Sequence, residues 1–259
     1  MRDEAPRAVT AICRSLQEQI AHGLLQPSGQ LPSERKLSEL FDTTRITLRE
    51  ALGQLESQGL IYREDRRGWF VSPPRIAYNP LVRSHFHAMV QEQGRTPATE
   101  VLSARLVPAA ADMCARLGLP ALSGVIQIRR ARRIDGRLVL YVEHYLNPSY
   151  FSGILDFDLT RSLTELYASE YDIHYGRVRF DMVPTVLHPE AASTLRTAPG
   201  SPALRITRLN RDQHDRLIDC DVEYWRHDAI HVCVEVPECG AEPIHWSVLC
   251  KSSRQIATG

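Results

Sequence analysis

The sequence of 259 residues predicts an α+β protein in two parts, a small helical head with a β-hairpin and a larger antiparallel sheet with flanking helices. Three observations support this prediction. Apolar residues recur at helical spacing in three successive segments before residue 60. Pro73, Pro74 and Pro80 then interrupt the pattern with a stiff connection. Beyond residue 80, strand-like runs dominate, and turn residues join several of them as hairpins.

The head begins with two predicted helices. The first covers residues 8–22 and ends at Gly23. Its apolar face comprises Val9, Ile12, Leu16 and Ile20. The second begins after Ser33, whose hydroxyl can accept hydrogen bonds from free backbone N–H groups, and it ends near Asp42.

A third helix and a hairpin complete the head. The helix starts at Thr43 and Thr44 and ends at Gly59. Its apolar stripe comprises Leu48, Leu52 and Leu55. Two β-like runs, 60–63 and 69–72, follow and are joined by a basic turn. Three helices followed by a basic hairpin are the plan of a winged helix-turn-helix over residues 1–72.

The polar residues of this head suit DNA. Arg45 and Arg49 lie four residues apart beside the leucine stripe, so both guanidiniums point outward, where they can contact guanine edges. Short hydroxyls for phosphate oxygens come from Thr43, Thr44 and Thr47. Arg66 and Arg67 at the hairpin tip, with Gly68 permitting close approach, predict a wing over the neighbouring groove. An arginine-rich solvated surface is the alternative, but the combination in this order favours double-stranded DNA as the partner.

The charge total does not reveal this partner. The formal net charge is zero, which would ordinarily argue against a nucleic acid. Residues 1–75 hold 11 Lys plus Arg and 10 Asp plus Glu, so the head itself is nearly neutral. The prediction of DNA binding therefore rests on where the arginines lie and not on their number.

A linker at 73–80 leads to the larger domain at 81–236, and a tail at 237–259 has no assigned role. Asp135-Gly136 between two strand-like runs is a strong hairpin signal, and Thr160 is the expected N-cap of the third helix of this domain. The predicted helices cover 81–93, 108–117, 159–167 and 189–196. The predicted strands cover 98–107, 125–134, 138–146, 174–187, 204–212, 217–225 and 231–236.

One predicted strand carries four arginines. Alternation places Arg130 and Arg132 on one face, and Arg129 and Arg133 on the other. One of these faces must meet the domain interior, where an unpaired guanidinium is costly. A small anion would resolve this cost, because the guanidinium fork matches phosphate-like oxygens. Internal ion pairing with Glu143 on the next strand is the alternative.

A later strand carries alternating acids. Asp219, Asp221 and Glu223 face one way, and Trp225 lies two residues further on. Carboxylates beside an indole ring suit a primary ammonium group through charge and cation–π contact. A solvated strand face is the alternative interpretation.

Enzyme motifs are not found. Neither a phosphate-binding glycine loop nor a Walker pattern is present, and Ser103 and Ser123 lie outside any nucleophile-elbow sequence. The sequence therefore predicts no enzyme and no cofactor. His227, His231 and Cys233 form the best candidate metal cluster, but His227 precedes the turn, so no metal site is predicted.

The compartment is expected to be the cytoplasm. The six cysteines never form a Cys-x-x-Cys pair, and the N-terminus lacks the apolar core of a signal peptide. We therefore expect reduced thiols. No window approaches eighteen uninterrupted apolar residues, so no membrane partner is expected.

The head resembles the gluconate-repressor (GntR) family of bacterial regulators. The matching motifs are Leu31-Pro32-Ser33-Glu34-Arg35, Arg45-Ile46-Thr47-Leu48-Arg49-Glu50-Ala51-Leu52, Gly59-Leu60-Ile61 and Gly68-Trp69-Phe70-Val71. The resemblance implies a homodimer that reads a two-fold operator. It also implies a DNA-contacting set of Ser33, Arg35, Thr44, Arg45, Thr47, Arg49 and Gly68.

The larger domain resembles the effector-binding (UTRA) domain of the histidine-utilisation (HutC-like) members, a fold similar to chorismate lyase. The matching residues are Arg130-Ala131-Arg132, Asp135-Gly136, Glu143, Ser162-Leu163 and Tyr224-Trp225-Arg226-His227-Asp228. The resemblance implies an effector pocket formed by Thr96, Arg130, Arg132, Glu143, Ser162, Asp219, Glu223 and Trp225.

Within that group, the motifs look like the regulators of 2-aminoethylphosphonate utilisation operons. The residues that carry this likeness are Thr43-Thr44-Arg45-Ile46-Thr47, Asp65-Arg66-Arg67-Gly68-Trp69-Phe70-Val71, Ser162-Leu163-Thr164-Glu165 and Glu223-Tyr224-Trp225-Arg226-His227-Asp228. The resemblance implies a repressor with a phosphonate effector. A sugar phosphate or a histidine-pathway acid as effector, activation in place of repression, and a lyase-like enzyme are the alternatives.

Overall fold

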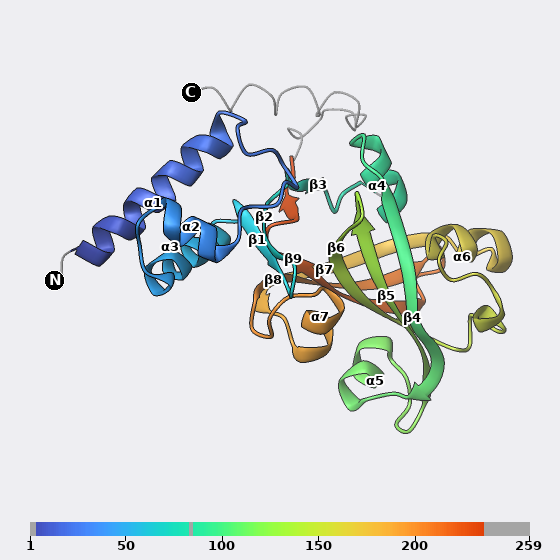
Figure 1. Ribbon diagram of the computed structural model, residues 1–259. Helices are drawn as coiled ribbons and strands as arrows, with labels where there is room; N and C mark the ends of the chain where they lie inside the picture. The colour runs from blue at the N-terminus through green and yellow to red at the C-terminus, as the bar shows by residue number, and fades with distance from the viewer. Residues whose placement is uncertain (1–3, 83–84, 236–259) are drawn as a thin grey trace.

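A computed structural model describes residues 4–82 and 85–235 and shows a small helical domain beside a larger sheet domain (Figure 1). The predicted tail at 237–259 lies outside the described residues. None of the helices formed by the described residues is long and apolar enough to cross a membrane.

The head domain contains α1 (Glu4–Ala21), α2 (Glu34–Leu40) and α3 (Arg45–Ser57), followed by strands β1 (Ile61–Glu64) and β2 (Gly68–Val71). The predicted apolar faces meet in one core. Its central residues are Val9, Ile12, Leu16, Leu48, Leu52 and Leu55, all buried. This packing leaves the start of α3 and the hairpin tip on the surface, as the helical periodicity predicted.

Polar side chains fix the ends of the two short helices. Ser33 accepts a hydrogen bond from the Lys36 backbone N–H at the start of α2, and Thr44 accepts one from Thr47 at the start of α3. The β1–β2 hairpin, called the wing below, turns through Arg66 and Gly68 with φ angles of 59° and 98°. Glycine adopts the second of these without steric cost.

The sheet domain is built on six strands in the order β4-β5-β6-β9-β8-β7, and every neighbouring pair is antiparallel. Their bounds are Pro97–Pro108 (β4), Gly124–Ile134 (β5), Arg137–Leu146 (β6), Tyr175–Val186 (β7), Pro202–Asp212 (β8) and Leu217–Arg226 (β9). Asp135 and Gly136 join β5 to β6 with φ angles of 51° and 79°, the geometry that the Asp-Gly pair predicted.

Helices cover both faces of this sheet (Figure 1). On one face lie α4 (Phe86–Glu92), which packs on Leu140, and α6 (Leu163–Tyr171), which packs on Ile128. On the other lie α5 (Ala111–Leu117) and α7 (Pro189–Thr194). A short 3₁₀ helix, η1 (Ile154–Asp156), precedes α6.

The last predicted strand does not extend the meander. The observed strand β10 (Ile230–Val232) pairs in parallel with β3 (Ile76–Tyr78), which lies within the predicted linker. A turn after Arg226, closed by the Ala229 backbone N–H, directs the chain away from β8. Both short strands then bury apolar side chains beneath α4, so the linker forms part of the sheet domain.

Two helices start later than predicted. The helix expected over 81–93 begins at Phe86 with His85 as its N-cap. The helix expected over 159–167 begins at Leu163, and its N-cap is Ser162. Thr160 instead donates its hydroxyl and backbone N–H to Asp158 in the preceding turn, so the prediction of Thr160 as the cap is wrong.

Candidate functional site

The predicted DNA-contacting residues gather around one open concavity of about 480 Å³ between α2, α3 and the wing. Seven of them line it: Ser33, Arg35, Arg45, Arg49, Arg66, Arg67 and Gly68. The three predicted threonines stand at the start of α3, where Thr44 and Thr47 share a 2.9 Å hydroxyl contact. The structure therefore brings the whole predicted set to one side of the head domain.

Two residues of this surface project without protein partners. The Arg45 guanidinium forms no hydrogen bond or ion pair with the described residues, and Ile46 is 81% exposed. Arg49 is held differently, because its Nε donates to Glu34 Oε2 at 2.8 Å. Although partial burial opposes it, hydrogen bonds from Arg49 and Trp69 lower the pKa of the Glu34 carboxyl. Glu34 thus positions Arg49, while Arg45 keeps all its donors available to DNA.

A second site lies on the sheet face that α4 and α6 cover. It is a cavity of about 310 Å³, called the sheet cavity below. Five residues of the predicted effector set line it: Arg130, Arg132, Ser162, Glu223 and Trp225. Its roof includes Phe86 of α4 and its wall includes Tyr175 of β7.

Arg132 is a buried cation of this cavity that forms no ion pair with the described residues. Its side chain is 7% exposed, and its Nε has no hydrogen-bond partner among the described residues. The guanidinium lies 4.6 Å from the centroid of the Phe86 ring. Burial, and next the neighbouring Arg130, lower the pKa of Arg132 well below its ordinary value. Burying this charge costs free energy, and an anion bound beside it would relieve that cost.

Arg130 faces the same way, but four of its five N–H donors are already used. Its Nε and Nη2 lie 3.1 and 2.8 Å from His144 Nε2, and its Nη1 donates to the carbonyl oxygens of Leu159 and Arg161. His144 Nε2 therefore accepts, and Nδ1 carries the proton that reaches Asp221 Oδ1 at 2.5 Å. Burial lowers the pKa of His144 to about 3, in agreement with this neutral form.

The three alternating acids also have protein partners. Asp221 accepts from Arg208 Nη2 at 2.5 Å as well as from His144. Glu223 pairs with Arg208 at 3.2 Å and accepts from Trp225 Nε1 at 2.7 Å. Against the effect of burial, His144 and Arg208 lower the pKa of Asp221. The sequence predicted that these acids bind an ammonium group. In the structure the Asp221 and Glu223 carboxylates already bind arginine, histidine and tryptophan side chains.

Asp219 lies beside the sheet cavity and does not line it. It is fully buried and accepts from Asn210 and from the Tyr175 hydroxyl, the latter at 3.0 Å. Burial and the nearby Asp221 charge raise its pKa to about 8. The raised pKa favours the protonated form of Asp219, which contacts the Tyr175 hydroxyl.

Glu143 and Thr96 were predicted to belong to the effector pocket, and the structure places both outside it. Glu143 lies on the opposite sheet face, 3.2 Å from Arg129, because successive residues of β6 alternate and His144 takes the cavity side. The ion pair predicted as the alternative does form with Glu143, but its arginine is Arg129 and not Arg132. Thr96 stands at the β5–β6 turn, where its backbone N–H donates to Asp135 Oδ1 at 2.8 Å. Neither residue lines the sheet cavity.

Arg208, Asn210 and His144 line the sheet cavity but were not singled out from the sequence. A signal was available for each. Arg208 and Asn210 lie two and four residues after buried Ile206 in β8, and His144 lies two residues after buried Val142 in β6, so each shares the strand face of that apolar residue. Period-two alternation applied to every predicted strand would have placed all three on the interior face.

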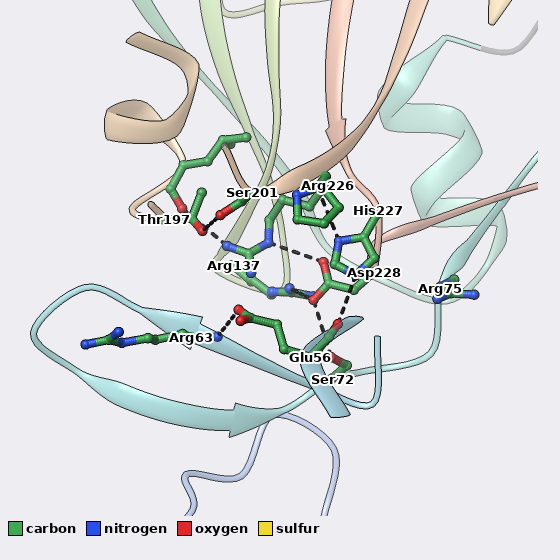
Figure 2. Close-up of polar contacts among 12 residues, drawn as sticks. Glu56, Arg63, Ser72, Arg75, Arg137, Thr197, Ser201, Arg226, His227 and Asp228 are labelled. Atoms are coloured by element: carbon green, nitrogen blue, oxygen red, sulfur yellow. Dashed lines mark hydrogen bonds and ion pairs between the residues drawn. The ribbon is translucent and has the colours of Figure 1, made fainter. Parts of the chain in front are cut away.

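A buried polar group joins the two domains (Figure 2). Arg137 at the start of β6 forms an ion pair with Asp228, which also accepts from Arg226 and from Ser72 Oγ, each at 3.3 Å. The Arg137 guanidinium packs 3.6 Å from the centroid of the Tyr62 ring in the wing. We call Ser72, Arg137, Arg226, His227 and Asp228 the interdomain cluster.

His227 bridges α3 to β8 within this cluster. Its Nε2 lies 3.0 Å from the Glu56 carbonyl oxygen, in the last turn of α3, and its Nδ1 lies 3.2 Å from the Pro202 carbonyl oxygen. Both oxygens are acceptors, so only the doubly protonated imidazolium donates to both. Trp225, two residues earlier on β9, lines the sheet cavity. One strand end therefore contacts both the cavity and the head domain.

Comparison with known proteins agrees with this architecture. Residues 8–71 match the gntR family of bacterial regulatory proteins, and residues 92–231 match the UTRA domain. The HTH-type transcriptional regulator YihL of Escherichia coli (strain K12) is 30% identical over 217 residues, 83% of this chain and 91% of that protein. The HTH-type transcriptional repressor NagR of Bacillus subtilis (strain 168) is 29% identical over 84% of this chain and 89% of its own length.

A solved structure shares the fold. PhnF from Mycobacterium smegmatis superposes with a TM-score of 0.62 at 22% identity, covering 87% of this chain and 99% of that one. The predicted fold class, a winged helix-turn-helix followed by a UTRA sheet domain, is confirmed. The relatives are transcriptional regulators and not enzymes. The chain thus belongs to the gntR family of bacterial regulatory proteins, as a HutC-like transcriptional regulator whose sheet domain is a UTRA domain.

Proposed function

We propose that this regulator is a repressor that binds a two-fold operator as a homodimer and releases it when a small phosphonate enters the sheet cavity. The observation that carries the proposal is Arg132, a buried guanidinium that lines the cavity and whose Nε has no partner in the described part of the chain. A phosphonate presents oxygens that match the guanidinium fork. The named relative NagR, itself a repressor, supports the sign of regulation.

The charge of the cavity supports an anionic ligand. Arg130, Arg132 and Arg208 face the carboxylates of Asp221 and Glu223, and the fourth lining arginine, Arg177, pairs with Asp215 outside the lining, so cations exceed acids by one. By analogy with phosphate, a phosphonate that carries an ammonium group has a net charge of about −1 at neutral pH. 2-Aminoethylphosphonate therefore balances the cavity, and its small size suits a space at the lower end of ligand-pocket volumes.

Titration calorimetry of the full chain tests the effector. We expect 2-aminoethylphosphonate to bind, phosphonoacetate to bind less tightly, and N-acetylglucosamine 6-phosphate not to bind. Arg132→Met should weaken phosphonate binding at least tenfold, because the free guanidinium is lost. Arg133→Met is the matched control, since Arg133 faces away from the cavity and pairs with Glu100.

Two outcomes would overturn the effector assignment. Binding of the sugar phosphate without the aminophosphonate would assign the cavity to phosphorylated sugars. Equal affinities in Arg132→Met and Arg133→Met would place the anion elsewhere.

Fluorescence anisotropy with DNA from upstream of the chain's own gene tests operator binding. We expect two protomers per site and release of the DNA when 2-aminoethylphosphonate is added. Arg45→Ala should weaken specific binding by about tenfold or more, because a bidentate guanine contact is worth about 1–3 kcal/mol. Tighter DNA binding in the presence of the effector would contradict repression relieved by the ligand, and unaltered affinity in Arg45→Ala would contradict the DNA surface.

A further inference from the structure

The wing and the loop that follows α7 lie side by side (Figure 1), and a second arginine-lined cleft lies between them. Its volume is about 760 Å³. The head domain contributes Arg63, Arg66 and Arg67, and the sheet domain contributes Arg196. The hydroxyl-bearing side chains of Ser193, Thr197 and Ser201 also line it.

The two walls of this cleft are held together by backbone contact. The Asp65 N–H at the wing tip donates to the Arg196 carbonyl oxygen at 3.1 Å. Arg196 itself adopts a left-handed φ of 54°, which ends α7 and projects its side chain from the loop. Thr197 and Ser201 stand on the sheet-domain side, opposite the wing strand that carries Arg63 (Figure 2).

Four arginines line the cleft against two carboxylates, those of Glu56 and Asp65, so its lining carries a net positive charge. The guanidiniums of Arg63 and Arg196 form no ion pair or hydrogen bond with the described residues, and both side chains are exposed. Arg66 lies 3.7 Å from Asp65, and both of these side chains are mostly exposed. Arg67 is the one arginine of the four with a close partner among the described residues, Glu64. Such a surface attracts a polyanion.

The geometry of B-DNA gives this second cleft a role. The minor groove is only about 6 Å wide and is bordered by a phosphate backbone on each side. A wing that enters the groove therefore has one backbone between itself and α3 and another on its far side. The concavity lined by Arg45 and Arg49 and the cleft lined by Arg196 share Arg63, Arg66, Arg67 and Trp69 of the wing, so each adjoins the wing and offers arginines to one backbone.

We propose that the second phosphate backbone runs through this cleft and that Arg196 contacts it, so the sheet domain contributes directly to DNA affinity. This inference rests on the proposed DNA surface of the head domain. It also gives the effector a direct route to the operator. Any ligand-dependent movement of the loop after α7 relative to the wing changes a DNA contact as well as the orientation of the head.

Operator binding measured by anisotropy at several salt concentrations tests the proposal. Neutralising one phosphate contact reduces the salt slope of binding by about one. We therefore expect Arg196→Gln to weaken binding roughly threefold to tenfold near physiological salt and to lower the slope by about one. Arg196→Lys should retain the wild-type slope. Arg105→Gln is the matched control, because Arg105 is exposed on β4 of the same domain and does not line the cleft.

Three results decide the matter. Wild-type affinity and slope in Arg196→Gln would overturn the proposal. Tighter binding in that variant would also overturn it and would show that the contact between the wing and the α7 loop opposes DNA binding. If Arg45→Ala leaves DNA binding unchanged, the head surface itself is wrongly assigned, which is a separate failure. Calorimetry with 2-aminoethylphosphonate on each variant verifies that the sheet domain is intact.

Discussion

Arg130 and Arg132 lie two residues apart on one strand face, yet they differ in what they can bind. Arg130 donates hydrogen bonds to His144 and to two backbone carbonyl groups. Arg132 stacks on Phe86 and keeps a buried Nε without a partner among the described residues. Arg130 thus holds the cavity wall together through its hydrogen bonds, whereas Arg132 gains hydrogen-bond and ion-pair partners when an anion binds.

This difference predicts opposite effects on stability. Arg130→Met should lower the free energy of unfolding by about 3 kcal/mol, because it leaves buried acceptors unpaired. Arg132→Met should leave the free energy of unfolding unchanged or raise it, since an unpaired buried charge is replaced by an apolar side chain. Urea denaturation of both variants, without ligand, measures the two effects. A larger loss in Arg132→Met than in Arg130→Met would contradict this division of roles.

Asp219 predicts a pH dependence. Its pKa in the folded protein is about 8, against an ordinary value of 3.8. The protonated form is thus favoured by folding, and its contribution to stability is complete below about pH 4 and is lost as the pH rises to about 8. Asp219→Asn mimics the neutral acid and should lose less stability between pH 5 and pH 8 than the wild type. Thermal unfolding at both pH values measures the difference, and equal losses would contradict the raised pKa.

Among the elements, α6 depends on a cap that also faces the cavity. Ser162 Oγ accepts from the Glu165 backbone N–H. Ser162→Ala should lower the free energy of unfolding by about 1 kcal/mol, measured by urea denaturation. Thr160→Ala is the control and should change it by less than about 0.5 kcal/mol, because Thr160 is exposed and bonds only within its turn. The reverse order of effects would restore Thr160 as the cap.

The elements that local sequence determines were predictable. Asp135 and Gly136 specify the β5–β6 hairpin by their own backbone preferences, and period-two alternation correctly separated Arg132 from Arg133. The β3–β10 pair was not predictable, because its strands lie about 150 residues apart and each has only three residues. The prediction that Glu143 lines the effector pocket was wrong for another reason. Its assignment came from resemblance, while its position next to His144 puts it on the other face.

At the scale of the whole molecule, the interdomain cluster is the candidate coupling element. A ligand changes DNA affinity only if its binding energy differs between two domain arrangements. Asp228 holds Arg137 and Arg226 beneath the wing, while β9 extends from there into the sheet cavity. Movement of β9 on ligand binding would therefore reach the head domain through the contacts of this cluster with Ser72, Tyr62 and Glu56.

Asp228→Asn should uncouple the two sites. We expect operator and effector affinities, each measured alone, to stay within about threefold of the wild type. The effector-induced change in operator affinity, typically about 1–3 kcal/mol in allosteric proteins, should fall toward zero. Asp181→Asn is the matched control, because Asp181 pairs with Arg179 on the surface of β7. Wild-type coupling in Asp228→Asn would remove the cluster from the allosteric route.

The parallel pairing of β3 with β10 has a consequence for synthesis on the ribosome. The head domain is complete at residue 72, but the partner of β3 is translated only with residue 232. At about 5–20 residues per second, roughly 10–30 seconds separate the two events. During that interval the nascent head can fold without a sheet domain to restrain it. A new chain therefore acquires its DNA-reading surface before it acquires the means to respond to a ligand.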